Sequence, residues 1–116
     1  MNESKRDQLI DAYLNGIDNE DKELLRGAFA PDIVHEHPVR YVEGIEDFLV
    51  FKVDEQPPQE SEHKVSRRIH VPEASVVEGR KVGTVEGESI DIQFCDVYEF
   101  NADDSAITKL SVYARE

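Results

Sequence analysis

Apolar residues in the first part of the chain recur with the period of an α-helix. Over residues 4–17 they share one helical face, made of Leu9, Ile10, Tyr13, Leu14 and Ile17. A similar stripe predicts a second, short helix over residues 19–29, which Asp18 or Asn19 can cap and after which Pro31 acts as a stop signal. A third helix is expected after Gly44. Its apolar face would consist of Ile45, Phe48, Leu49 and either Lys52 or Val53.

The rest of the chain alternates between apolar and polar residues, as strands do. A short strand is expected over residues 32–39 (DIVHEHPV), ending at Pro38 or lying at an edge, because proline has no N–H to donate to a sheet. After a loop over residues 55–61, longer strands are expected at residues 63–71, 74–85, 89–101 and 106–114. Helices followed by antiparallel strands predict an α+β fold, in which a curved sheet packs on the helices and tends to enclose a pocket.

One charged residue interrupts the apolar face of the strand IDIQFCDVYEF, residues 90–100. Alternation puts Ile90, Ile92, Phe94, Tyr98 and Phe100 on one face, and Asp96 falls among them. A buried carboxylate costs several kcal/mol unless it is paired, hydrogen-bonded or neutralised. Asp96 is therefore either a structural carboxylate that a nearby donor satisfies or a pocket carboxylate with a shifted pKa. Cys95 falls on the opposite face, where a subunit contact is expected.

Two histidines and a tyrosine are further candidates for chemistry. His35 and His37 point the same way from the short strand, roughly 7 Å apart. They are a hydrogen-bonded pair at a sheet edge, a general base, or two ligands of a metal whose third ligand has no recognisable spacing. Tyr13 is a core tyrosine or a hydroxyl donor that points into the pocket. Arg67 is a solvated strand charge or a residue at the pocket rim, and it shares its parity with Val65 and Ile69.

Composition narrows the choice of partners and compartment. The 116 residues include 26 acidic and 13 basic ones, a net charge of −13, which argues against nucleic acid and anionic membranes as partners. No apolar run reaches the length of a membrane span, and MNESKRDQL lacks the apolar part of a signal peptide. A single cysteine allows no internal disulfide. A cytoplasmic protein is expected, and no phosphate loop or dinucleotide fingerprint points to a cofactor.

Three stretches carry a resemblance to a known family: AFAPDIVHEHP at residues 28–38, EGIEDF at 43–48 and FCDVYEFNADDSAITKLSVY at 94–113. Through them the chain resembles the NTF2-like superfamily, and within it SnoaL-like and ketosteroid-isomerase-like proteins. The resemblance implies an NTF2-like cone, with three N-terminal helices on a strongly curved antiparallel sheet. It also implies one domain over residues 1–116 and a homodimer. The fold hosts isomerases, cyclases, dehydratases, epoxide hydrolases and non-catalytic modules.

Ketosteroid isomerases are the sharpest comparison within this superfamily. Their mechanism uses a carboxylate base just before a proline, while a tyrosine on the first helix and a protonated aspartic acid hold the enolate oxygen. By this resemblance Tyr13 falls at the tyrosine position and Asp96 at the aspartic acid position. His37, immediately before Pro38, stands where the base is a carboxylate in those enzymes, which puts steroid isomerisation itself in doubt. If Asp96 were ionised close to His37, each would favour the charged form of the other, and the pair would be inert.

The leading hypothesis is a cofactor-independent enzyme that binds a small, mostly apolar molecule and moves a proton next to a carbonyl. His37 would be the base, and Tyr13 and Asp96 would stabilise the oxyanion. Substrate contacts are expected from His35, Phe94, Tyr98 and Phe48. The alternatives are a ligand-binding or dimerisation module without catalysis, and metal-assisted chemistry at His35 and His37.

Overall fold

The computed structural model describes residues 1–57 and 59–115. Three helices form, as predicted: α1 (Glu3–Asp18), α2 (Lys22–Ala28) and α3 (Ile45–Leu49), which continues as the π-helical turn η1 (Val50–Asp54). Two short strands, β1 (Phe29–Glu36) and β2 (Tyr41–Glu43), lie between α2 and α3. The long strands follow: β3 (Gln59–Val71), β4 (Ala74–Val85), β5 (Glu88–Phe100) and β6 (Ile107–Arg115). None of the helices among these residues is long and apolar enough to cross a membrane.

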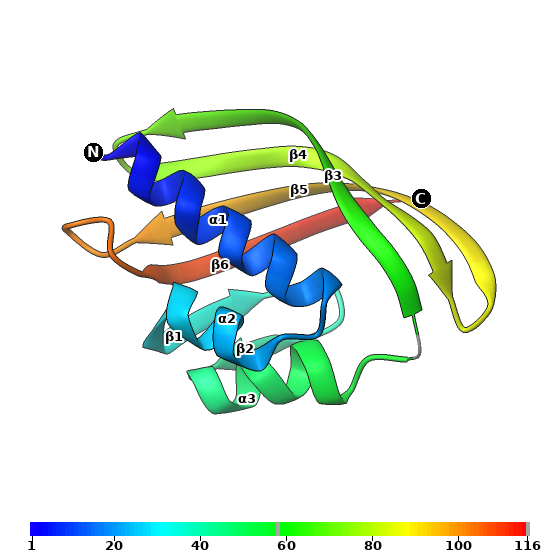
Figure 1. Ribbon diagram of the computed structural model, residues 1–116. Helices are drawn as coiled ribbons and strands as arrows, with labels where there is room; N and C mark the ends of the chain where they lie inside the picture. The colour runs from blue at the N-terminus through cyan, green and yellow to red at the C-terminus, as the bar shows by residue number, and fades with distance from the viewer. Residues whose placement is uncertain (58, 116) are drawn as a thin grey trace.

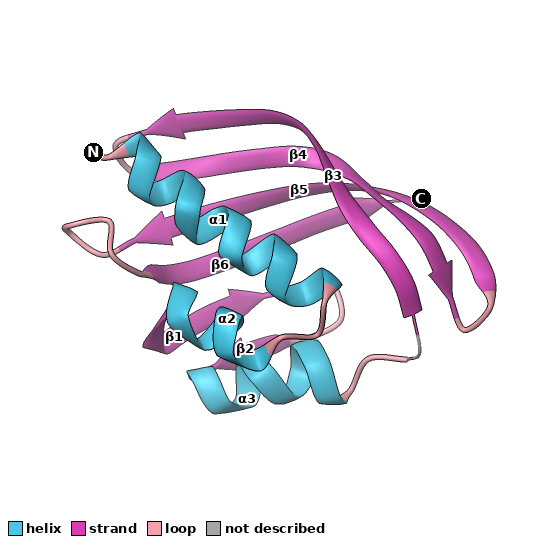
Figure 2. Ribbon diagram, in the orientation of Figure 1, coloured by secondary structure: helices cyan, strands magenta, loops and turns pink. Residues whose placement is uncertain are grey.

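The strands form one curved sheet in the order β2-β1-β6-β5-β4-β3. Strands β3 to β6 are an antiparallel meander, whereas β1 runs parallel to β6 and antiparallel to β2. Helix α1 lies along the concave side of the sheet, and α2 and α3 close the same side beside β1 and β2 (Figure 1). All three helices therefore cover one face of the sheet (Figure 2), which confirms the predicted α+β arrangement.

The core lies between α1 and the concave face of the sheet. Tyr13 from α1 meets Phe29 and Tyr98 edge-on, with ring centroids 5.6 and 5.9 Å apart. Each large apolar side chain that is fully buried contributes about 1.5–3 kcal/mol relative to an exposed one. The largest such side chains include Tyr98, Phe48, Ile10, Leu25, Ile33, Ile107, Leu110 and Val77.

A buried arginine ties the start of α1 to the sheet, at the end of the cone away from the C-terminus. The Arg6 side chain is 4% exposed and forms an ion pair with Asp104, with Nε and Oδ1 3.1 Å apart. Its guanidinium donates to the carbonyl oxygens of Val71 and Pro72 at 2.6 and 2.8 Å. The same group stacks on Phe100, 4.6 Å from the ring centroid. Arg6 therefore holds together the β3–β4 turn, the β5–β6 turn and α1.

Replacing Arg6 by alanine is expected to lower the free energy of unfolding by about 3–5 kcal/mol, because the buried Asp104 carboxylate loses its cation. Urea denaturation measures this loss. The neighbouring Lys5→Ala is the control and should change stability by less than about 0.5 kcal/mol, since its side chain is exposed. A loss below about 1 kcal/mol for Arg6→Ala would contradict the structural role given to this ion pair.

The strand boundaries differ from the prediction in ways that matter for the site. The first strand ends at Glu36 and not at residue 39, so His37 lies in the turn to β2. There its N–H and carbonyl pair with the carbonyl and N–H of Arg40, each at 3.1 Å. The short strand β2 was not expected, and β3 begins at Gln59, inside the predicted loop. The cap of α2 is Asp21, rather than Asp18 or Asn19, which leaves the Asp18 side chain free for another partner.

The apolar residues of β3 do not form one face, although Val65, Ile69 and Val71 share a parity in the sequence. The register shifts between Val65 and Arg67, so Val65 lies on the opposite face from Ile69 and Val71, and all three are 37–43% exposed. At this point β3 passes very close to Gly79 of β4, where a Cβ would lie 2.2 Å from the Lys64 carbonyl oxygen. Only glycine allows this approach without a shift of the backbone. The bulge and the glycine together let β3 and β4 bend around the pocket.

Candidate functional site

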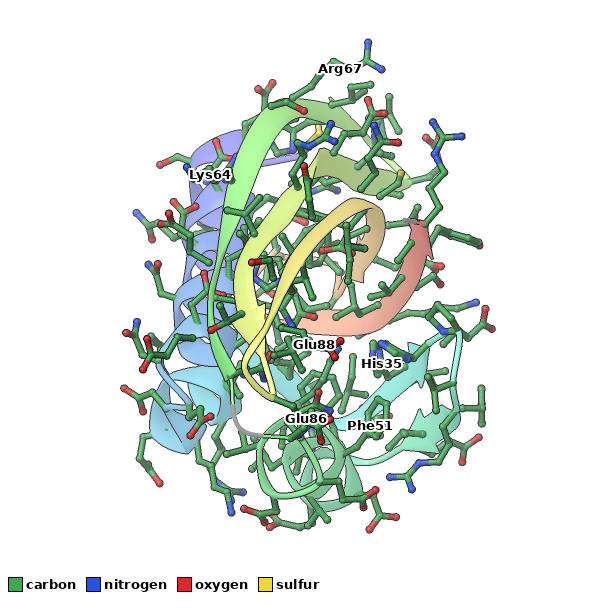
Figure 3. The ribbon with its side chains drawn as sticks, turned by 90° about the vertical axis from the view of Figure 1, so that its right-hand side faces the viewer. His35, Phe51, Lys64, Arg67, Glu86 and Glu88 are labelled. Atoms are coloured by element: carbon green, nitrogen blue, oxygen red, sulfur yellow. The ribbon has the colours of Figure 1, made fainter. Side chains whose placement is uncertain are left out.

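A cavity of about 290 Å³ lies at the end of the cone near the C-terminus. It is bounded by the last turns of α1, by η1 and by strands β3 to β6. Figure 3 views the molecule from this end, with the β4–β5 turn at Glu86 and Glu88 in the foreground. The apolar part of the wall consists of Ile17, Pro38, Ile92, Phe94, Val112 and Ala114. The groups that can exchange protons or carry charge are Tyr13, His37, Lys52, His63, Lys81, Asp96 and Arg115.

Asp96 is the buried acid of this cavity. Its side chain comes from the middle of β5 and the residue is 2% exposed, as the alternation of that strand predicted. The Tyr98 hydroxyl donates a hydrogen bond to Oδ2 at 3.0 Å. Burial raises the pKa of Asp96 to about 6, while attraction to Lys52 and the Tyr98 hydrogen bond keep it from rising further. This carboxyl group therefore gains and loses its proton close to neutral pH.

Tyr13 reaches the same cavity from α1. The residue is 2% exposed, and burial together with the nearby Asp96 charge raises the pKa of its phenol well above the ordinary value. The hydroxyl therefore keeps its proton across the physiological range and can act only as a neutral hydrogen-bonding group.

The two histidines of the β1 region occupy different environments. His35 is fully buried, and its Nδ1 contacts the Leu110 carbonyl oxygen at 3.0 Å, an arrangement in which the ring nitrogen must donate. Burial, with a contribution from the Lys52 charge, lowers the pKa of His35 to about 3. Its Nε2 is buried with no hydrogen-bond partner in the part of the chain that the structure describes. His35 therefore stays neutral and does not line the cavity.

His37 lines the cavity in a defined tautomer. Its Nδ1 accepts a hydrogen bond from the Val39 N–H at 3.1 Å, so the neutral ring carries its proton on Nε2. Burial, followed by the charges of Lys52 and Lys81, lowers the pKa of His37 to about 4. At neutral pH this side chain is an uncharged hydrogen-bond donor. A base role for His37 requires the other tautomer, in which the bond from Val39 is lost.

A third histidine, His63, was not singled out from the sequence, and it has the opposite tautomer to His37. His63 Nδ1 lies 2.6 Å from Asp18 Oδ1, and the His63 backbone N–H donates to Asp18 Oδ2 at 2.9 Å. Both oxygens of the Asp18 carboxylate thus bind His63, which fixes the ring with its proton on Nδ1. Since His63 lines the cavity, Nε2 is the nitrogen that remains for a ligand, and it carries a lone pair. A histidine oriented in this way by a carboxylate is the arrangement of a general base.

Two lysines complete the polar wall. Burial lowers the pKa of Lys52 to about 8, although attraction to Asp96 opposes this. Burial also lowers the pKa of Lys81, opposed by Asp18, and the Lys81 ammonium donates to Gln59 Oε1 at 3.0 Å. Lys52 Nζ lies 5.7 Å from the centroids of the Tyr13 and Phe51 rings. Both ammonium groups are therefore held against apolar surroundings.

Of the residues proposed from the sequence, Tyr13, His37, Phe94 and Asp96 line the cavity. His35, Phe48 and Tyr98 are fully buried and do not line it, so they reach a ligand only through other side chains. Arg67 pairs with Glu78 and points away from the molecule (Figure 3), so the alternative that it reaches the pocket rim was wrong.

Four ionisable residues that line the cavity were not proposed from the sequence: Lys52, His63, Lys81 and Arg115. Lys52 could have been noticed in the sequence, because it is a charged residue on the apolar face of the third predicted helix. No spacing in the sequence points to His63, since its partner Asp18 is 45 residues away. Within the described residues, no group of three or more His, Cys, Asp or Glu side chains is arranged to hold a metal ion.

This protein has a curved sheet packed on three helices and a cavity with acid–base groups at one end. That architecture is typical of small α+β proteins with a cone-shaped fold. The family model of the SnoaL-like domain matches residues 10–109. The chain therefore belongs to the SnoaL-like family, within the NTF2-like superfamily. No curated protein shows a significant match.

Solved structures of this class superpose well at low sequence identity. An LEH-like epoxide hydrolase from M. tuberculosis has a TM-score of 0.82 and 20% identity, with 97% of this chain and 84% of that one covered. A proposed SnoaL-like polyketide cyclase from Shewanella denitrificans has a TM-score of 0.82 and 15% identity, with coverage of 95% and 90%. A proposed ketosteroid isomerase from Kribbella flavida has a TM-score of 0.78 and 17% identity, with coverage of 97% and 79%. At such identities these similarities establish the fold alone.

Proposed function

We propose that the cavity is the active site of a cofactor-independent enzyme that moves a proton next to the carbonyl of a small, mostly apolar molecule. The observation that carries this proposal is Asp96, a carboxyl group inside an apolar cavity with its pKa raised to about 6. A structural carboxylate in a core is normally paired or hydrogen-bonded so that it stays ionised. Here burial moves the pKa of Asp96 toward neutrality, so that both the protonated and the ionised forms are populated near pH 6, as acid–base catalysis requires.

The roles follow from which atoms carry protons. Protonated Asp96, with Tyr13, would donate hydrogen bonds to the oxygen that becomes negative when the neighbouring carbon loses its proton. His37, whose Nε2 carries a proton, is a further donor to that oxygen. Phe94 and the apolar wall would hold the body of the substrate, while His35, Phe48 and Tyr98 support these side chains from behind.

The base is assigned to His63 in this proposal, although the sequence pointed to His37. His63 Nε2 offers a lone pair, and the Asp18 carboxylate would stabilise the imidazolium that forms when the ring takes a proton. His37 would have to give up its bond from Val39 to do the same. The two assignments differ in a measurable way, because replacing the true base slows proton removal most.

The experiment is exchange of carbon-bound hydrogen for deuterium in D₂O, followed by proton NMR on a panel of small aryl ketones and 3-oxo compounds. It requires no knowledge of the natural product and detects proton removal alone. The account predicts catalysed exchange next to the carbonyl of at least one neutral ketone. No exchange above the buffer rate with any member of the panel would contradict the proposal.

The pH dependence of this exchange has a definite sign. Because Asp96 must be protonated, its titration makes kcat/KM fall as pH rises through the pKa of Asp96, about 6, while the need for a neutral His63 limits the rate at lower pH. A kcat/KM that rises through about pH 6, and still does so in His63→Gln, would show that the Asp96 carboxylate itself is the base. Rate profiles from about pH 5 to 8.5 distinguish the two results.

The alternative is a ligand-binding or dimerisation module without catalysis. One observation favours pairing of two copies: the outer face of the sheet exposes Ile69, Val71 and Tyr113 around the half-buried Val97 and Cys95. Antiparallel sheets that leave apolar side chains on an open face commonly bury them against another surface. The homodimer stays a prediction, and it is compatible with either function.

A further inference from the structure

The cavity has a charge opposite to that of the whole protein. The chain carries 26 acidic and 13 basic residues, yet Asp96 is the only acidic side chain among the described residues that line the cavity. Its other ionisable groups are Lys52, Lys81, the histidines His37 and His63, the phenol of Tyr13, and Arg115 at the rim. Arg115 is engaged by Gln93, to which its Nε donates at 2.7 Å. The concentrated positive charge therefore comes from the two lysines.

These lysines also differ from the lysines of the surface. Lys22, Lys64 and Lys109 are 36–64% exposed and each contacts a carboxylate, whereas the exposed Lys5 donates to the Asp103 carbonyl oxygen. Within the described chain, neither Lys52 nor Lys81 has a carboxylate oxygen within 4.0 Å, although 26 acidic residues are available. An ammonium group that is partly removed from water without an anion beside it is unfavourable. Asp96 attracts Lys52 and Asp18 attracts Lys81 from beyond contact distance, and an anionic ligand between the two lysines would add the negative charge that is missing beside them.

Neighbouring groups respond to this positive charge. The charge of Lys52 contributes to the lowered pKa of His35 and of His37, and Lys81 contributes to the lowered pKa of His37 and of Lys52. Groups on three elements (η1, the β1–β2 turn and β1) are therefore affected by the positive charge of the two lysines. An anion in the cavity would relieve it, whereas a neutral ligand would not.

We propose that the natural substrate is a small organic anion, an oxo acid with an apolar body, whose carboxylate lies between Lys52 and Lys81 while the apolar wall covers the rest. This assignment names the substrate class of the active site proposed above and rests on that function. The carboxylate would take the place that Gln59 occupies beside the Lys81 ammonium. Charge-assisted hydrogen bonds to two ammonium groups would fix which end of the molecule faces Asp96.

Binding of an anion should be coupled to uptake of a proton. A negative ligand beside Asp96 raises the pKa of that carboxyl further, from about 6, so the mostly ionised group takes up a proton at pH 7. Lys52, whose pKa is about 8, becomes more fully protonated for the same reason. The substrate thereby generates the protonated Asp96 that the proposed mechanism requires.

The test compares phenylpyruvate with its methyl ester by titration calorimetry, since the two share the apolar body and the oxo group but differ in charge. The acid is expected to bind at least about tenfold more tightly than the ester at pH 7. Lys52→Met and Lys81→Met should each weaken binding of the acid by about tenfold and leave the ester nearly unaffected. Lys64→Met is the matched control, because Lys64 lies on β3 outside the cavity (Figure 3), and it should change neither.

Repeating the titration in buffers of different ionisation enthalpy measures the proton uptake, which should approach one proton per phenylpyruvate and fall clearly in Asp96→Asn. Equal affinity for acid and ester, or no loss in either cavity lysine variant, would overturn the inference. So would binding of inorganic phosphate as tight as that of phenylpyruvate, because the apolar wall would then contribute nothing. If the protein catalyses exchange on neutral ketones but does not prefer the acid to the ester, only the inference of an anionic substrate is refuted. If the protein binds the acid but catalyses exchange on no member of the panel, only the proposed proton-transfer function is refuted.

Discussion

Replacing Asp96 by leucine is expected to slow hydrogen–deuterium exchange by about 10²–10³-fold, the usual cost of losing one oxyanion donor. The leucine side chain has a similar shape but cannot donate to the developing negative charge. Exchange rates at about pH 6, compared with those of the wild type, measure the effect. A rate within about threefold of the wild type would mean that Asp96 does not touch the reacting oxygen.

Asp96→Asn is the matched variant, because the amide keeps a neutral donor in nearly the same place. Its oxygen can accept the bond from Tyr98 while its NH₂ group faces the cavity. We therefore expect it to retain more of the rate than Asp96→Leu and to lose the decline of kcat/KM through about pH 6. A decline that persists in Asp96→Asn would assign this pH dependence to another group.

The same variant should also stabilise the protein at neutral and higher pH. The pKa of Asp96 is raised in the folded state, so the stability associated with it is fully present below the unfolded value of 3.8 and is lost as pH rises through about 6. A difference of about two pKa units corresponds to at most about 3 kcal/mol. Asp96→Asn should thus raise the free energy of unfolding by about 1–3 kcal/mol at pH 8 and change it little near pH 4. Lower stability at pH 8 would indicate a structural carboxylate.

Replacing His63 by glutamine is expected to lower kcat for exchange by about 10²–10⁴-fold, the range that a positioned general base contributes. Glutamine can still donate to Asp18, so the link between α1 and β3 is retained while the lone pair of Nε2 is lost. His37→Gln is the comparison within the same cavity. It should cost about tenfold at most, because the glutamine NH₂ group can still donate and only the position of a neutral donor changes. If His37→Gln lowered kcat more than His63→Gln, His37 and not His63 would be the base.

Asp96 shows what the sequence can predict. Strict alternation over residues 90–100 placed it on the buried face, and burial alone is the largest cause of its raised pKa. The three helices and the four long strands were likewise evident from the period of the apolar residues. Such features depend on local patterns and on the need to bury one face of each element.

The base and the cationic groups depend on contacts that no local pattern encodes. His63 is defined by Asp18, on another element, and the sequence interpretation had assigned Asp18 to a helix cap. His37 looked like a base from its place before Pro38, but its tautomer is set by a turn that begins one residue after the strand ends. The bulge in β3 likewise puts Val65 on the opposite face from Ile69 and Val71, since one shift in register reorients every side chain beyond it.

The most direct test of the account is the carbon-13 chemical shift of the Asp96 carboxyl group, followed from pH 3 to 9 and assigned by its absence in Asp96→Asn. The account predicts a titration midpoint of about 6, in the unliganded protein. It also predicts a higher midpoint in Lys52→Met, because the attraction that holds the value down is removed. A midpoint near the ordinary value of 3.8 would mean that Asp96 stays ionised at every physiological pH, and the proton-transfer site proposed here would not exist.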